Sequence, residues 1–230
     1  MNRRVLITGA NGALGLVTTN YFLGKGYAVT AVLSSMDKRS LFPENPLLEL
    51  VAVDLTDEAA TAALVETQIN LHPELEGVLL LAGGFAMGSL STTDDAALLQ
   101  QFKLNFLTAY HVARPAYHYF EKAGRGRLVF VGARPALLAS AGKDMSAYAL
   151  SKSLLFRLAE QINAASKKQD ITATVIVPST IDTAANRQAM PDANFADWVS
   201  PEHIAAVMEW LFSAPASVLR EPVLKLYNKA

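Results

Sequence analysis

The feature that most constrains the fold is a group of glycines directly after the first apolar segment. Residues 5–8 read Val-Leu-Ile-Thr, which suits a buried strand, and a helical pattern of apolar residues follows. Gly9, Gly12 and Gly15 lie at the junction of the two segments. Glycines at this spacing allow a tight turn, a close approach of backbone to a pyrophosphate, and close packing of helix on strand. A turn without a ligand is the alternative, although three glycines reduce stability more than such a turn requires.

The rest of the chain alternates short apolar segments with longer helical patterns. This alternation predicts a parallel sheet with helices on both faces. Right-handed crossovers then give a doubly wound α/β domain of the Rossmann type. We expect one domain over residues 1–230, with about seven strands, at 5–8, 27–33, 48–53, 77–81, 127–131, 171–177 and 223–227. Helices are expected at 14–25, 58–69, 94–122, 146–166 and 202–212.

Two local expectations accompany this assignment. The helix over 94–122 contains Pro115, where we expect it to bend, because proline lacks the N–H that a helix needs. Residues 179–200 have no clear periodicity, and long segments of this kind often form binding loops. We therefore expect a substrate-binding lid there, within the same domain.

Composition narrows the classes of function. With 51% hydrophobic residues, a chain of 230 residues can bury a substantial core without disulfides or metal. The absence of cysteine excludes thiolate nucleophiles and cysteine-based metal sites, and the four histidines lack metal-ligand spacing, so no metal is expected. The balance of 20 basic and 21 acidic residues gives no reason to expect a nucleic acid partner. No apolar run reaches the ~18 residues of a membrane span, and the first is too short for a signal peptide, so we expect a cytoplasmic protein without a membrane partner.

A tyrosine and a lysine four residues apart form the candidate catalytic pair. Tyr148 and Lys152 lie in a helical segment and therefore share one face of it. A nearby ammonium is expected to lower the pKa of the phenol from ~10, which suits a proton donor to a carbonyl that receives hydride. Tyr21 and Lys25 have the same spacing, but they lie late in the first helix, away from the strand ends where such sheets bind ligands. We interpret Tyr21 as a packing residue and Lys25 as a surface residue.

The end of the second strand bears on the choice of nucleotide cofactor. In dinucleotide-binding folds an acidic residue there holds the ribose 2′-hydroxyl of NAD. Here that position is Leu33, followed by Ser34 and Ser35, with Lys38 and Arg39 nearby. Hydroxyls and cations in place of a carboxylate favour a 2′-phosphate, so NADP(H) is the expected cofactor. NAD(H) and an ordinary solvated loop stay open as alternatives.

Taken in order, these motifs resemble the short-chain dehydrogenase/reductase family along essentially the whole chain. The motifs that carry the resemblance are Thr8-Gly9 with Gly12 and Gly15, Asp54, Ala82-Gly83, Asn105, Tyr148 with Lys152, and Pro178 to Thr183. The resemblance implies that Tyr148 donates a proton, that Lys152 tunes it and holds the nicotinamide ribose, and that Asn105 holds a water in the same relay. It also implies a homodimer or homotetramer formed through helices at 97–120 and 147–165.

The cofactor contacts expected from the glycine motif, the second strand and the resemblance gather into four groups. The set is Gly9, Asn11, Gly12, Ala13, Leu14 and Gly15 in the first turn, Ser34 and Ser35 after the second strand, Asp54, Leu55, Ala82, Gly83 and Gly84 after the third and fourth strands, and Lys152, Pro178, Ser179, Ile181 and Thr183 beside the nicotinamide.

Departures from the family pattern point to a subgroup. Ala133 occupies the position after the fifth strand where the family has a serine that hydrogen-bonds the substrate carbonyl. The quinonoid dihydropteridine reductases also lack that serine, and the Asp-Thr, Asn-Arg, Met-Pro and Phe…Trp elements of residues 182–198 recur in them at similar spacing. A quinonoid pterin is already electrophilic and does not need a second donor. Two differences oppose a direct transfer of substrate: Leu33 replaces their NAD-type carboxylate, and the loop between Ala133 and Tyr148 is longer here.

These observations predict an NAD(P)H-dependent oxidoreductase that transfers hydride to a small carbonyl or quinonoid molecule, with a dihydropteridine among the candidates. A redox-silent NADP(H)-binding sensor or scaffold is the alternative, favoured by Ala133 and opposed by the intact Tyr148 and Lys152. Nucleotide-sugar epimerisation shares the glycine motif, but the chain is too short for an added substrate domain. Arg134 has two open interpretations, a structural role and contact with an anionic group.

Overall fold

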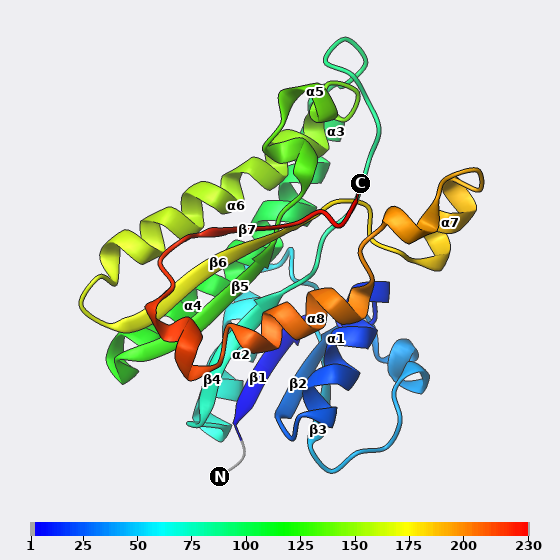
Figure 1. Ribbon diagram of the computed structural model, residues 1–230. Helices are drawn as coiled ribbons and strands as arrows, with labels where there is room; N and C mark the ends of the chain where they lie inside the picture. The colour runs from blue at the N-terminus through cyan, green and yellow to red at the C-terminus, as the bar shows by residue number, and fades with distance from the viewer. Residues whose placement is uncertain (1–2, 230) are drawn as a thin grey trace.

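A seven-stranded parallel sheet forms the centre of the molecule in the computed structural model, which describes residues 3–229 (Figure 1). The strand order is β3-β2-β1-β4-β5-β6-β7, and each neighbouring pair is parallel. This confirms the predicted doubly wound α/β fold. The strands are β1 (Arg4–Thr8), β2 (Ala28–Leu33), β3 (Leu48–Ala52), β4 (Leu75–Leu80), β5 (Arg125–Val131), β6 (Asp170–Pro178) and β7 (Val223–Leu226).

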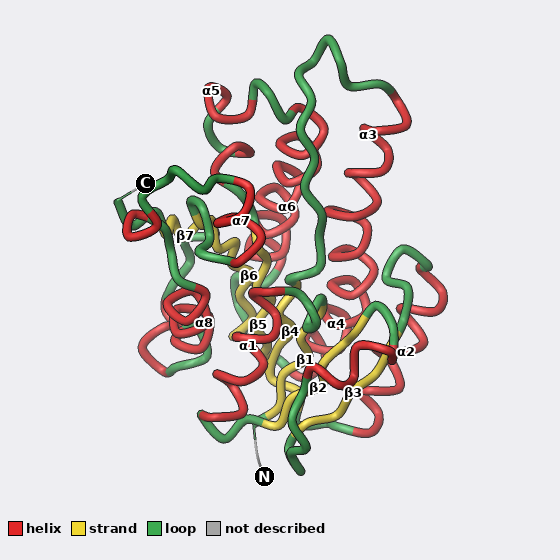
Figure 2. The backbone as a smooth tube through the Cα atoms, turned by 90° about the vertical axis from the view of Figure 1, so that its right-hand side faces the viewer, coloured by secondary structure: helices red, strands yellow, loops and turns green. Residues whose placement is uncertain are grey.

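Helices cover both faces of this sheet (Figure 2). Helices α1 and α8 pack together on one face, while α2, α4 and α6 lie on the other. Each face buries its own apolar cluster, the first around Phe22 and Met208 and the second around Phe120 and Phe130. None of the helices within residues 3–229 is long and apolar enough to cross a membrane. The helices are α1 (Ala13–Gly24), α2 (Glu58–Leu71), α3 (Asp95–Phe102), α4 (Thr108–Ala123), α5 (Ala139–Gly142), α6 (Ser146–Ala165), α7 (Ala184–Ala189) and α8 (Pro201–Trp210).

The expected helix over 94–122 is divided before it reaches Pro115, the residue at which the sequence predicts a bend. Pro115 sits inside α4, which continues through it to Ala123. Packing of α4 against α2 and the sheet keeps the helix continuous although proline removes one hydrogen bond. The break lies earlier, at a π-helical segment over Lys103–Leu107 that separates α3 from α4. Such segments are frequent at functional sites.

The strand ends are brought to one edge by the parallel register. Thr8, the last residue of β1, pairs with Val32 of β2 on one side and with Leu80 of β4 on the other. The connections that leave these ends therefore meet along the carboxyl edge of the sheet. Between β1 and β4 the strand order reverses, and open α/β sheets bind their ligands at such a reversal.

Gly15 sets how closely α1 approaches β1. A Cβ at this position would lie 2.1 Å from the Gly9 carbonyl oxygen and 2.7 Å from the Ala10 Cα. Gly24, at the other end of the same helix, has open space around its missing Cβ.

We predict that Gly15→Ala destabilises the fold by about 1–3 kcal/mol, because backbone atoms must shift to relieve the overlap. Gly24→Ala is the matched control, expected to be neutral or stabilising by up to about 1 kcal/mol since alanine favours a helix. Urea unfolding of both variants measures the difference. Equal stability of the two variants would contradict the packing described for Gly15.

Candidate active site

The turn after β1 has the geometry expected of a phosphate cradle. Gly9 has a φ of +61°, and a Cβ there would lie 2.8 Å from the backbone nitrogen of Ala82. Gly12 precedes α1 as its N-cap residue and offers no side chain to cap the helix. The first N–H groups of α1 therefore have no intrahelical partner and carry the positive end of the helix dipole. Residues Asn11 to Leu14 thus fit a pyrophosphate at this edge of the sheet.

The segment after β2 is tied to this turn by hydrogen bonds. The Asn11 side chain donates to Ser34 Oγ and accepts from the Ser34 backbone N–H, both at 3.3 Å. Ser35 Oγ donates to the carboxylate of Asp37 at 2.9 Å and accepts from its backbone N–H. A carboxylate therefore lies two residues after Ser35, although none occupies the Leu33 position itself. Asp37 is therefore a further carboxylate beside the predicted cofactor contacts Ser34 and Ser35.

The ends of β3 and β4 supply the next group of predicted contacts. Asp54 accepts hydrogen bonds from the Thr56 backbone and hydroxyl, which lower the pKa of its carboxyl. Thr8 Oγ1 accepts from the backbone N–H groups of Leu81 and Ala82, at 3.1 and 3.3 Å. These contacts hold the chain that leaves β4 against the end of β1.

Lys152 lies on α6 and is almost completely buried, with 5% of its surface exposed. Its Nζ donates to the carbonyl oxygen of Val131 at 2.8 Å. Tyr148 lies one turn earlier on α6, and its ring meets that of Phe85 edge-on, with centroids 5.1 Å apart. The Tyr148 hydroxyl has no hydrogen-bond partner within residues 3–229, so it stays free for a ligand.

Asn105 connects this pair to the loop after β4. It is fully buried in the π-helical segment, where its Oδ1 accepts from the Gly84 backbone N–H at 2.9 Å. Its Nδ2 donates to Gln101 Oε1 at 2.9 Å and to Ser151 Oγ at 3.1 Å. Because Ser151 Oγ also donates to the Tyr148 carbonyl oxygen, one chain of hydrogen bonds runs from Asn105 to the start of α6.

Gly83 allows the side chains of Asn105 and Lys152 to lie close together. A Cβ on Gly83 would lie 2.6 Å from Asn105 Oδ1 and 3.1 Å from Lys152 Nζ. The structure therefore brings the three predicted catalytic residues, Tyr148, Lys152 and Asn105, to one place beside the glycine turn. Sequence reasoning missed Ser151 and Gln101; the signal available for Gln101 was its position one helical turn before Asn105.

Burial changes the expected proton affinities of the pair. Desolvation raises the pKa of Tyr148 to about 12 and lowers the pKa of Lys152 to about 8. The sequence predicted a lowered pKa for Tyr148, so that expectation is wrong for this structure. The physical reason is that helical spacing shows which residues are close together but not whether they are buried. Burial disfavours the charged form of both the phenol and the amine.

Phe85 is a feature of the site that sequence analysis did not single out. It follows Gly84 in the loop between β4 and α3 and remains 61% exposed while it contacts Tyr148. The loop is pinned on its far side, where Gly88 N–H donates to the Asp144 carbonyl oxygen at 2.8 Å. An exposed aromatic ring is thus held next to the candidate proton donor.

The segment after β6 is built as an ordered flap. Ser179 Oγ donates to the Tyr227 carbonyl oxygen at 2.8 Å, and Ile181 forms an isolated bridge with Val199 that closes the base of the flap. Thr183 caps α7 by accepting from the Asn186 backbone N–H. Pro178, Ser179, Ile181 and Thr183 therefore follow one another from the carboxyl end of β6 into the flap.

The outer part of the flap is held by charge and aromatic contacts. Arg187 makes two hydrogen bonds to the Asp182 carboxylate, at 2.6 and 2.7 Å, which lower the pKa of that carboxyl. The guanidinium also lies 4.8 Å from the centroid of the Phe195 ring, which in turn contacts Trp198.

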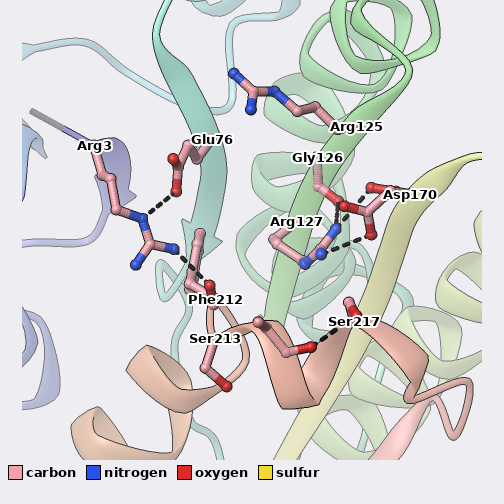
Figure 3. A pocket seen from close by; sticks show the side chains of 10 residues that line it. Arg3, Glu76, Arg125, Gly126, Arg127, Asp170, Phe212, Ser213 and Ser217 are labelled. Atoms are coloured by element: carbon pink, nitrogen blue, oxygen red, sulfur yellow. Dashed lines mark hydrogen bonds and ion pairs between the residues drawn. The ribbon is translucent and has the colours of Figure 1, made fainter. Parts of the chain in front are cut away.

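The opposite edge of the sheet carries a cavity of about 380 Å³ (Figure 3). Two of its arginines are neutralised internally, Arg3 by Glu76 at 2.7 Å and Arg127 by Asp170 at 2.7 Å. The side chain of Arg127 is largely buried in this pair. The cavity contains no acid–base pair comparable to Tyr148 and Lys152, so it is a poor candidate for chemistry.

The second tyrosine–lysine pair and the histidines add no site. Lys25 Nζ lies 5.4 Å from the ring centroid of Tyr21 at the end of α1, away from the carboxyl edge. No group of three or more histidine, aspartate and glutamate side chains within residues 3–229 could hold a metal ion.

Comparison with known proteins matches the short chain dehydrogenase family over residues 3–194. Dihydropteridine reductase of Dictyostelium discoideum is 24% identical over 237 aligned residues, which cover 100% of this chain and 96% of the relative. The 3-oxoacyl-[acyl-carrier-protein] reductase MabA of Mycobacterium tuberculosis is 26% identical, with 97% of this chain and 91% of the relative covered.

Solved structures share the fold. ElxO with NADP bound superposes with a TM-score of 0.90 at 18% identity, over 98% of this chain and 97% of that chain. A short chain dehydrogenase/reductase family oxidoreductase from Burkholderia thailandensis gives a TM-score of 0.85 at 22% identity, over 98% and 91%.

We predict that Lys152 loses its proton near pH 8, well below the ordinary value of 10.5. The NMR resonance of its side chain should titrate with that midpoint and be missing from Lys152→Met. A midpoint near 10.5 would contradict the burial described here.

The same shift has a consequence for stability. Because the unfolded chain holds this proton more tightly, the stability of the wild-type protein relative to Lys152→Met should rise as the pH increases from about 8 toward 10.5. Parallel unfolding curves across that range provide the measurement.

Proposed function

Because the chain belongs to the short-chain dehydrogenase family of oxidoreductases, we propose that it is an NAD(P)H-dependent reductase of a small carbonyl or quinonoid substrate. The observation that carries this proposal is the convergence of Tyr148, Lys152 and Asn105 beside the glycine turn. A proton donor, a buried cation and a phosphate cradle at one edge are the groups that reduction by a nicotinamide requires.

Each residue has a distinct task in this proposal. When bound, a nicotinamide cofactor would supply a hydride, and the turn from Gly9 to Gly15 would hold its pyrophosphate. The Tyr148 hydroxyl delivers the proton to the reduced oxygen or nitrogen atom; its raised pKa keeps it protonated through the neutral range. The Lys152 ammonium stabilises the phenolate that remains, and below about pH 8 it is still charged. Asn105 fixes the loop and helix start that carry these groups.

NADP(H) is the proposed cofactor. Ser34 and Ser35 offer hydroxyls after β2, and Lys38 and Arg39 add positive charge in the exposed turn that follows. Asp37 disfavours a 2′-phosphate, because its carboxylate already accepts the hydrogen bond of the Ser35 hydroxyl. NAD(H) is therefore the competing cofactor, and Asp37 is the residue that favours it.

A planar, already electrophilic substrate such as a quinonoid dihydropterin suits the site. Ala133 is buried at the end of β5 and supplies no hydroxyl with which to polarise an ordinary carbonyl. The exposed ring of Phe85 beside Tyr148 offers a flat apolar contact for such a substrate. The flap over residues 179–200 is proposed to cover it and to exclude water.

A homodimer or homotetramer is proposed through α3, α4 and α6. Leu98 and Leu99 of α3 and Leu150 and Leu154 of α6 are exposed large apolar side chains on helices that pack against each other. Contact with a second copy of the chain would remove these apolar side chains from water. Sedimentation analysis at micromolar concentration should find a dimer or tetramer, and a monomer would contradict the proposal.

The test of function is a matched panel of oxidation assays. We predict that the protein oxidises NADPH with quinonoid dihydropterin faster than with simple ketones, and that calorimetry gives a tighter Kd for NADPH than for NADH. Tighter binding of NADH would reverse the cofactor assignment. Binding of NADPH without oxidation across carbonyls, quinones and pterins would instead support the alternative, a redox-silent sensor or scaffold.

A further inference from the structure

Arg134 differs from the other partly buried arginines of the described chain. Arg4 is within 3.5 Å of the carboxylates of Glu49 and Glu74, and Arg127 pairs with Asp170. Arg134 is partly buried as well, yet within residues 3–229 its side chain makes no ion pair or hydrogen bond. Its Nε is completely buried and lacks a partner. Because removing a charged donor from water without a partner is costly, this arrangement needs an explanation.

A second unpartnered donor belongs to the aromatic residue that packs against Arg134. The guanidinium carbon of Arg134 lies 5.2 Å from the centroid of the Tyr227 ring. The Tyr227 hydroxyl is also buried and, like the Arg134 Nε, has no partner. Contact with an aromatic face restrains the guanidinium and offsets only part of its desolvation. The Arg134 Nε and the Tyr227 hydroxyl, on side chains that pack against each other, are therefore both left with unused hydrogen-bonding capacity.

The position of this pair in the fold connects it to the candidate active site. Arg134 directly follows Ala133 at the end of β5, and Tyr227 directly follows β7. The strand between them, β6, leads into Ser179, whose hydroxyl donates to the Tyr227 carbonyl oxygen at 2.8 Å. The pair thus lies on the carboxyl edge, where parallel sheets bind ligands, on the side of the site away from the phosphate cradle.

We infer that Arg134 and the Tyr227 hydroxyl form a subsite for an anionic group of the substrate, namely a carboxylate. A guanidinium matches the two oxygens of a carboxylate, and a phenolic hydroxyl can add a third hydrogen bond. The substrate class is then a carbonyl or quinonoid compound that carries a carboxylate. This inference rests on the proposed reductase function and deepens it.

The first test uses substrates that differ only in charge. Aryl oxo acids, with the carboxylate at increasing distance from the ketone, are compared with their methyl esters as oxidants of NADPH. The wild type should have a higher kcat/KM for at least one acid than for its ester. Arg134→Gln should lower the value for that acid by about tenfold to a hundredfold and that for the ester by much less. Equal losses for acid and ester would overturn the inference.

Three further variants separate recognition from folding. Arg134→Lys keeps the charge and should retain part of the preference for acids, while Tyr227→Phe removes one hydrogen bond and should lose several-fold. Arg125→Gln, at the opposite end of β5, removes the same charge from an exposed position and should leave the preference unchanged. If Arg134→Gln does not fold, the lysine and phenylalanine variants decide, and an unchanged acid preference in both would overturn the inference.

A binding measurement keeps the test independent of catalysis. Benzoate and benzamide are titrated calorimetrically into the protein with NADPH present. Benzoate should bind more tightly than benzamide, and the difference should vanish in Arg134→Gln. If no compound oxidises NADPH, the reductase proposal fails, while this titration still decides the subsite. Equal binding of the two probes by the wild type would overturn it.

Discussion

The parallel direction of all seven strands is the constraint on which the site depends. It brings the residues that follow β1, β2, β4, β5 and β6 to one edge, although they are separated by most of the chain. The glycine turn closes this edge tightly, since neither Gly9 nor Gly15 has space for a side chain. The helix dipole, the buried lysine and the candidate proton donor consequently share a small volume. The parallel direction of the strands thus determines both the fold and where the candidate catalytic groups lie.

Desolvation dominates the electrostatics of this volume. The Lys152 ammonium is held by one backbone carbonyl oxygen, and no carboxylate hydrogen-bonds to it among the described residues. Burial therefore favours its neutral form and also favours the neutral form of Tyr148. A phosphate group bound nearby would favour the charged lysine again, because an opposite charge raises the proton affinity of an amine. Cofactor binding and the protonation of Lys152 are coupled in this account.

Much of the fold could be predicted from the sequence because periodicity and glycine spacing are local signals. The seven strands, and the shared helix face of Tyr148 and Lys152, follow from them. The π-helical segment could not be predicted, because Asn105 within it forms hydrogen bonds to Gly84 and Ser151, which are distant in the sequence. Burial of Tyr148 likewise depends on tertiary packing.

The remaining surprises are contacts between segments that the sequence does not relate. Phe85 reaches Tyr148 because the loop after β4 is pinned beside the start of α6. Arg134 reaches Tyr227 because β6 separates the strands that carry them by only one position in the sheet. The sequence contains Phe85 and Arg134, but it does not show which side chains they contact in the folded chain.

The central claim is that the Tyr148 hydroxyl donates the proton in a reduction by NADPH. Single-turnover oxidation of bound NADPH, measured for the wild type and for Tyr148→Phe, tests it most directly. The account predicts the same Kd for NADPH in both proteins and a chemical step at least ~100-fold slower in the variant with a ketone substrate. Equal rates of NADPH oxidation in the two proteins would contradict it.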